Sequence, residues 1–122
     1  MTETVDLQGE VIGLGTLAAM AVLLYGTFVS TEIAGVAAVD VATVIFAGTF
    51  VVVAALHAWI GQYNLAWGHG GAGAGLLFVL LGESLQRVAI GLLLLFLSGA
   101  YIALVVRRLH REAEAAAAGV DA

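Results

Sequence analysis

The ionisable residues that interrupt the long apolar runs of this chain are the ones whose types and spacing could do chemistry. Between Ala72 and Val106 only Glu83 and Arg87 are charged. They are four residues apart, so a helix would place them on one face, where they could pair. An ionisable pair in an apolar environment is a candidate functional site because burying either charge alone is costly. In the alternative interpretation, both residues lie at a lipid–water interface and mark where a helix begins.

Histidine is the other residue type here that could bind a ligand or relay a proton. His57 lies one turn before the end of an apolar segment, His69 follows in a glycine-rich run, and His110 lies among arginines. A metal site needs three or four converging ligands, and the chain has no cysteine and no acid at ligand spacing from the first two histidines. We therefore predict no metal site. His57 stays a candidate as a haem ligand or as an amphipathic interfacial residue, with no cofactor assigned.

The residues around His57 carry one resemblance. Leu56–Gly61 (LHAWIG) resembles the end of the second helix in the small membrane-anchor subunits of succinate dehydrogenase. The resemblance implies three membrane spans and a haem b whose axial ligand would be His57. The Asp-Tyr pair of that family would fall on Gly68–His69, where neither residue type is present. We do not assign the chain to that family.

The sequence argues against catalysis and against nucleic acid as a partner. It contains no recognisable nucleophile–base pair or carboxylate dyad, so we expect no catalytic residues and no enzyme activity. The net charge is −5, from nine acidic and four basic residues. Nucleic acid requires the opposite, a basic surface.

Three apolar segments have the length needed to cross a lipid bilayer. Hydrophobic residues make up 62% of the 122 residues and charged residues 11%, whereas soluble domains have about 45–50% and about 25%. The segments are Val11–Ser30, Val39–Ile60 and about Arg87–Val106. Twenty helical residues measure about 30 Å, the thickness of the hydrocarbon core. The sequence therefore predicts an all-α, multi-pass membrane protein with three transmembrane helices.

The apolar stretch before the third span is too short to cross on its own. One helix from Ala72 to Val106 would be about 52 Å long, which exceeds the bilayer even when tilted. We therefore expect Gly70–Gly82 to be an interfacial helix, a re-entrant segment, or a helix extension covered by a partner. The run Gly68–Gly75 lacks the Lys and Ser/Thr of a phosphate-binding loop, so we expect a flexible, tight connection there.

The charged residues outside the spans predict the domain boundaries and the orientation. Residues 1–10 are acidic without a base, residues 11–107 hold the spans, and residues 108–122 form an alanine-rich helical tail. Arg107, Arg108 and Arg111 flank the last span, and such clusters stay in the cytoplasm. With three crossings, the N-terminus would lie outside the cell membrane and the C-terminus in the cytoplasm.

Small residues within the spans predict close helix packing. They are Gly15 and Ala19 in the first span and Gly91, Ser98, Gly99 and Ala103 in the third. In lipid, such residues let helix backbones approach closely. Trp59, Tyr63 and Trp67 gather at one end of the second span, as an aromatic belt does at the lipid–water boundary.

These features favour a non-catalytic accessory or anchoring subunit of a membrane complex, assembled as a homo- or hetero-oligomer. A partner would cover Gly70–Gly82 and the small-residue faces. The alternative is a homo-oligomeric small transporter or channel with Glu83 and Arg87 in its pathway. A third hypothesis is a haem b or quinone-associated anchor that uses His57.

Overall fold

A computed structural model describes residues 2–120 and, for their side chains, residues 7–119. Over these residues the chain forms four helices joined by short connections: α1 (Thr2–Phe28), α2 (Ala38–Trp59), α3 (Tyr63–Leu80) and α4 (Leu85–Val120). A small hairpin of β1 (Glu32–Ile33) and β2 (Val36–Ala37) links α1 to α2. The predicted all-α architecture is confirmed. Residue 1 of the predicted acidic segment and residues 121–122 of the predicted tail lie outside the described part.

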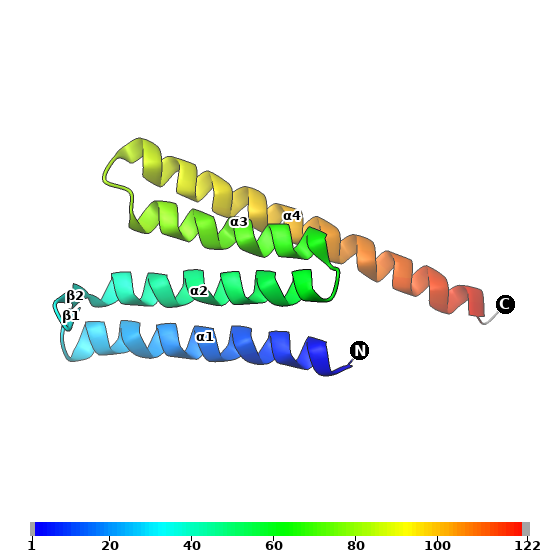
Figure 1. The fold of residues 1–122 in the computed structure, drawn as a ribbon, viewed down its shortest axis with the longest axis horizontal. Helices are drawn as coiled ribbons and strands as arrows, with labels where there is room; N and C mark the ends of the chain where they lie inside the picture. The colour runs from blue at the N-terminus through cyan, green and yellow to red at the C-terminus, as the bar shows by residue number, and fades with distance from the viewer. Residues whose placement is uncertain (1, 121–122) are drawn as a thin grey trace.

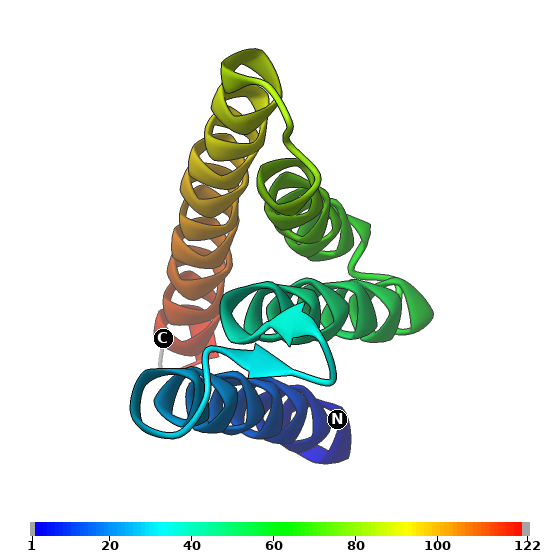
Figure 2. The ribbon, with the colours of Figure 1, turned by 90° about the vertical axis from the view of Figure 1, so that its left-hand side faces the viewer.

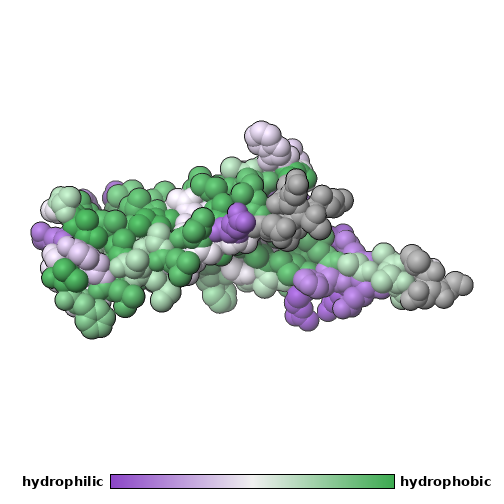
Figure 3. Space-filling model, turned by 90° about the horizontal axis from the view of Figure 1, so that it is seen from below, coloured by the Kyte–Doolittle hydropathy of each residue, from purple (hydrophilic) through white to green (hydrophobic). Residues whose placement is uncertain are grey.

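Three of these helices are long and apolar enough to cross a membrane. Within the described residues the candidate spans are Leu7–Phe28, Ala38–Trp59 and Leu85–Gly119. Hydrophobic residues cover most of the side of the molecule seen in Figure 3, and hydrophilic residues gather near the hairpin and along the end of α4. Large apolar side chains such as Phe28 (79% exposed) and Phe96 (74% exposed) point outward, which is the arrangement that a lipid environment favours.

The stretch before the last span differs from what we expected. Gly70–Gly82 is not a separate short segment, and Gly68–Gly75 is not a flexible connection. Residues up to Leu80 belong to α3, an 18-residue helix about 27 Å long. The expected connection at Gly68–Gly75 was wrong because α3 begins at Tyr63, so polar residues such as Asn64 and His69 dilute its hydropathy and hide its first two turns. An interfacial, re-entrant or partner-covered position for Gly70–Gly82 stays a prediction.

The four helices lie side by side in chain order. Extensive contacts join α1 to α2, α2 to α3 and α3 to α4, and each helix runs antiparallel to the one before it (Figure 1). Viewed from the end, α1 and α2 form one side, while α3 and the inclined α4 form a second (Figure 2). The start of α1 and the end of α4 therefore lie at the same end of the molecule (Figure 1).

Glycines allow α3 to pack against two neighbours at once. Gly68, Gly71 and Gly75 face α4, where an added Cβ would meet Ile102, Ser98 and the backbone of Gly91. Gly73 lies on another face, where an added Cβ would be 3.2 Å from the carbonyl oxygen of Ala47 in α2. Spacings of three and four residues keep the first stripe on one side of the helix. The glycine-rich composition thus serves close packing, the main source of helix association in lipid.

The connections use residues suited to their backbone angles. Ala34 (φ 51°) and Gly35 (φ 81°) form the two-residue turn between β1 and β2, which is the pattern of a type I′ hairpin. Ser84 precedes α4, and its hydroxyl accepts a hydrogen bond of 3.4 Å from the backbone N–H of Arg87, as an N-cap residue does. After the third span, α4 continues into the tail, where Arg108 and Glu112 form an exposed ion pair of 2.8 Å.

The α3–α4 contact predicts a position-specific penalty for a single methyl group. A Cβ at Gly91 would lie 2.7 Å from the carbonyl oxygen of Gly75, so Gly91→Ala should destabilise the fold by about 1–3 kcal/mol through overpacking. Gly48 has nothing within 4 Å of an added Cβ, so Gly48→Ala serves as the matched control and should be neutral or mildly stabilising. Unfolding in mixed micelles, followed by far-UV circular dichroism, measures both. Equal effects would contradict the close contact.

Candidate functional site

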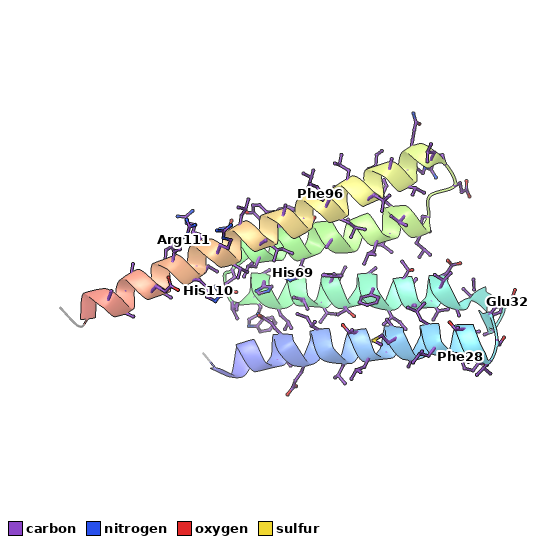
Figure 4. The ribbon with its side chains drawn as sticks, turned by 180° about the vertical axis from the view of Figure 1, so that it is seen from behind. Phe28, Glu32, His69, Phe96, His110 and Arg111 are labelled. Atoms are coloured by element: carbon purple, nitrogen blue, oxygen red, sulfur yellow. The ribbon has the colours of Figure 1, made fainter. Side chains whose placement is uncertain are left out.

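The most concentrated polar cluster that we find between the helices is a pair of histidines on α2 and α3. The His57 and His69 rings stack with centroids 4.9 Å apart and an interplanar angle of 28°. His57 is only 6% exposed, and the ring of Phe50 lies 6.1 Å from His69. Figure 4 shows His69 between α3 and α2, near the end that holds the chain termini. The sequence pattern indicates a candidate ligand at His57 and a glycine-rich loop around His69, so the pair is not predictable from it.

The turn after α2 brings a glutamine to the same site. Gly61 adopts φ 78°, its N–H bonds to the carbonyl of Ala58 at 3.1 Å, and the N–H of Gln62 bonds to the carbonyl of His57 at 2.8 Å. This is the Schellman arrangement that ends a helix with a left-handed glycine. It turns the chain back so that the Gln62 side chain reaches the His57 ring, with Oε1 at 2.8 Å from Nδ1. Gly61 followed by Gln62 was the sequence signal for this turn.

Hydrogen bonds at the two rings restrict their tautomers. His69 Nδ1–H donates to the carbonyl of Leu65 at 2.8 Å, which leaves Nε2 of the neutral ring with the lone pair. His57 Nδ1–H donates to Gln62, while the amide nitrogen of Gln8 on α1 lies 3.3 Å from the same Nδ1. One nitrogen cannot donate and accept at once. The tautomer of His57 therefore determines whether its Nδ1 bonds to Gln62, directly after α2, or to Gln8 on α1.

The cluster can link three helices and can accept a proton, but the described residues do not supply the ligand set of a metal site. Metal-binding histidines also tie back one ring nitrogen, yet a metal needs three or four ligands, and no group of three metal-binding side chains occurs among the described residues. Because His69 stacks on the face of the His57 ring and Gln62 holds its Nδ1, Nε2 is the nitrogen left for another partner, and a haem ligand role for His57 stays a prediction.

The structure does not bring Glu83 and Arg87 together as one helix face. Glu83 precedes the capping residue Ser84 and lies in the α3–α4 connection, whereas Arg87 is in the first turn of α4. Both side chains are exposed, and the ion pair found among the described side chains is the one between Arg108 and Glu112. The expected i, i+4 pairing was wrong because the helix begins between the two residues. Arg87 instead borders an apolar groove on α3.

The residues predicted for helix packing fall into two groups. Four of them lie in helix contacts or are buried: Gly15 against Thr49, Ala19 at 0% exposure, Gly91 against Gly75, and Ser98 at 8% exposure beside Gly71. Gly99 and Ala103 are exposed, and nothing lies within 4 Å of a Cβ added at Gly99. The aromatic residues Trp59, Tyr63 and Trp67 are exposed by 90%, 64% and 79% around the α2–α3 turn.

Comparison with known proteins adds no relative to this description. No protein family, curated protein or solved structure matches the chain.

The histidine cluster predicts that His57 stabilises the fold while His110 does not. His57→Ala would remove a buried ring and leave Gln62 without its partner, which should cost about 1–3 kcal/mol of unfolding free energy. His110 makes a similar Nδ1 contact of 2.9 Å to the carbonyl of Val106, but it is exposed, so His110→Ala should change stability by less than about 0.5 kcal/mol. Mixed-micelle unfolding compares the two. Similar losses of unfolding free energy in both variants would show that the cluster does not stabilise the fold.

Proposed function

We propose that this chain is a non-catalytic subunit of a larger membrane assembly, and that it joins its partner through an outer face of α4. The observation that supports the proposal is the exposed pair Gly99 and Ala103, flanked along the same helix by Leu92 and Phe96. Leu92 is 56% exposed and Phe96 74% exposed, and Phe96 points away from α3 (Figure 4). This partner face is separate from the side of α4 that carries Gly91 and Ser98 against α3.

The physical argument rests on what drives association in lipid. A large exposed apolar side chain needs no protein partner there, because lipid tails are as apolar as leucine. Gly99 and Ala103 are four residues apart on one side of α4, and they have no large side chain that would keep another helix backbone at a distance. The helix order adds to this argument, since α4 is the last helix of the row and its extensive contacts are with α3.

The segment Gly70–Gly82 gives no support for a partner. We had expected a partner to cover Gly70–Gly82, but α2 and α4 of the same chain pack against α3. A transporter or channel with Glu83 and Arg87 in its pathway gains no support from the geometry, because the two residues are exposed and separated by the helix cap. The partner face on α4 is therefore the feature on which the assembly proposal depends.

Bulky substitutions on the partner face should dissociate the assembly. We expect Gly99→Leu and Ala103→Leu to lower the mass of the detergent-solubilised particle, because the added atoms keep the second backbone away. Ala100→Leu is the matched control, since Ala100 is exposed on the same helix but turned about 100° from Gly99. Light scattering after size exclusion in mild detergent gives the mass and shows whether the partner is a second copy. A monomeric wild-type protein, or equal behaviour of all three variants, would refute the proposal.

We further infer that both termini lie in the cytoplasm, in place of the N-terminus-outside arrangement that three crossings would give. The inference is supported by α3, which lies between two candidate spans and is about 27 Å long, close to the hydrocarbon thickness. With four crossings, Arg107, Arg108 and Arg111 share the terminal side, and Arg87 is the base at the other end. This distribution obeys the positive-inside tendency.

The orientation can be tested with single cysteines, because the chain has no native cysteine. Glu10→Cys near the start of α1 and Ala115→Cys in the tail should react with a membrane-impermeant maleimide only after the cells are opened. Glu32→Cys in the hairpin at the other end should react in intact cells. Opposite responses of Glu10→Cys and Ala115→Cys would show three crossings, with α3 outside the bilayer core.

A further inference from the structure

The end of the molecule opposite the termini has an apolar groove with an arginine beside it. The groove has a volume of about 530 Å³ and is lined by Ala74, Leu77 and Phe78 of α3, by Leu81 directly after that helix, and by Arg87 of α4. The first four of these residues follow the i, i+3, i+4, i+7 spacing of one helical face, distinct from the glycine stripe that packs on α4. From Leu81 to Ala74 the groove extends about 10 Å along the helix, from the α3–α4 connection toward the middle of the layer.

The charge beside this groove is not balanced by the described residues around it. No ion pair forms with Arg87 among the described side chains, where Arg108 and Glu112 supply the single pair found. Glu83, the nearest acid in the sequence, lies before the Ser84 cap and is exposed. A guanidinium at the edge of an apolar slot is complementary to a ligand with a negative head and an apolar tail.

The groove and Arg87 contribute differently to the choice of ligand. The apolar walls would accept any lipid chain but prefer none, because bulk lipid tails are equally apolar. Arg87 can discriminate, because its guanidinium binds the phosphate oxygens of any phospholipid but its full positive charge favours a headgroup of net negative charge over a zwitterionic one. We propose that the groove binds an anionic phospholipid, with one acyl chain along α3 and its headgroup phosphate on Arg87. This site is independent of the partner face on α4, so either proposal can fail alone.

Native mass spectrometry of the full chain, released from detergent with equimolar phosphatidylglycerol and phosphatidylcholine, tests the proposal. We expect the wild type to carry phosphatidylglycerol about threefold more often than phosphatidylcholine, a ratio typical of one interfacial ion pair. Arg87→Gln should bring this ratio to about one. Arg107→Gln, which removes the same charge about 30 Å farther along α4, should leave the ratio largely unchanged. No preference in the wild type, or equal losses in both variants, would overturn the site.

Two further experiments distinguish the contribution of the groove from that of the charge, and the binding of a whole lipid from the binding of a phosphate anion alone. Ala74→Phe should fill the groove and reduce retention of both lipids, whereas Ala100→Phe on the exposed side of α4 should not. Inorganic phosphate at millimolar concentration should leave the bound phosphatidylglycerol in place. Displacement by phosphate alone would overturn the proposal in favour of a free-anion site, and unchanged retention in Ala74→Phe would show that no acyl chain occupies the groove.

Discussion

Backbone contact between helices without intervening side chains is the constraint on which this structure depends. In lipid the hydrophobic effect does not draw one helix to another, so packing depends on how closely the backbones approach. α3 meets this condition on two sides, with Gly75 against Gly91 on α4 and Gly73 against Ala47 on α2. The position of α3 in turn determines the order of the helices, the common end for both termini, and the meeting of the two histidine rings.

The way in which α2 ends and α4 begins determines which polar side chains meet. The left-handed glycine after α2 returns the chain at once and joins Gln62 to His57. The serine before α4 instead starts a new helix between Glu83 and Arg87 and separates them. Two pairs at similar sequence spacing thus have opposite outcomes. The first becomes a hydrogen-bonded cluster within the layer, and the second leaves an arginine beside an apolar groove.

The long apolar spans could be predicted from the sequence, and the internal packing could not. Length and hydropathy were enough to find α1, α2 and α4 because no acidic residue, lysine or arginine interrupts those runs for about twenty residues. They failed for α3, whose glycines contribute little hydropathy although their lack of a side chain is what makes the helix fit. His69 was missed for the same reason, since a histidine among glycines reads as a loop until the neighbouring backbones are in place. The Glu83–Arg87 pairing failed because a spacing of four residues has meaning only inside one helix, and Ser84 is compatible with both readings.

The length of α4 has a mechanical consequence. Its 36 residues form one uninterrupted helix, about 54 Å from end to end, whereas the bilayer core takes up about 30 Å. The remainder projects as a stiff rod, because its alanines favour the helix and no proline interrupts it. A rod of this kind acts as a lever: a change of about 10° in the inclination of α4 would move its far tip sideways by about 9 Å. Small adjustments within the bilayer would thereby become large displacements in the aqueous phase.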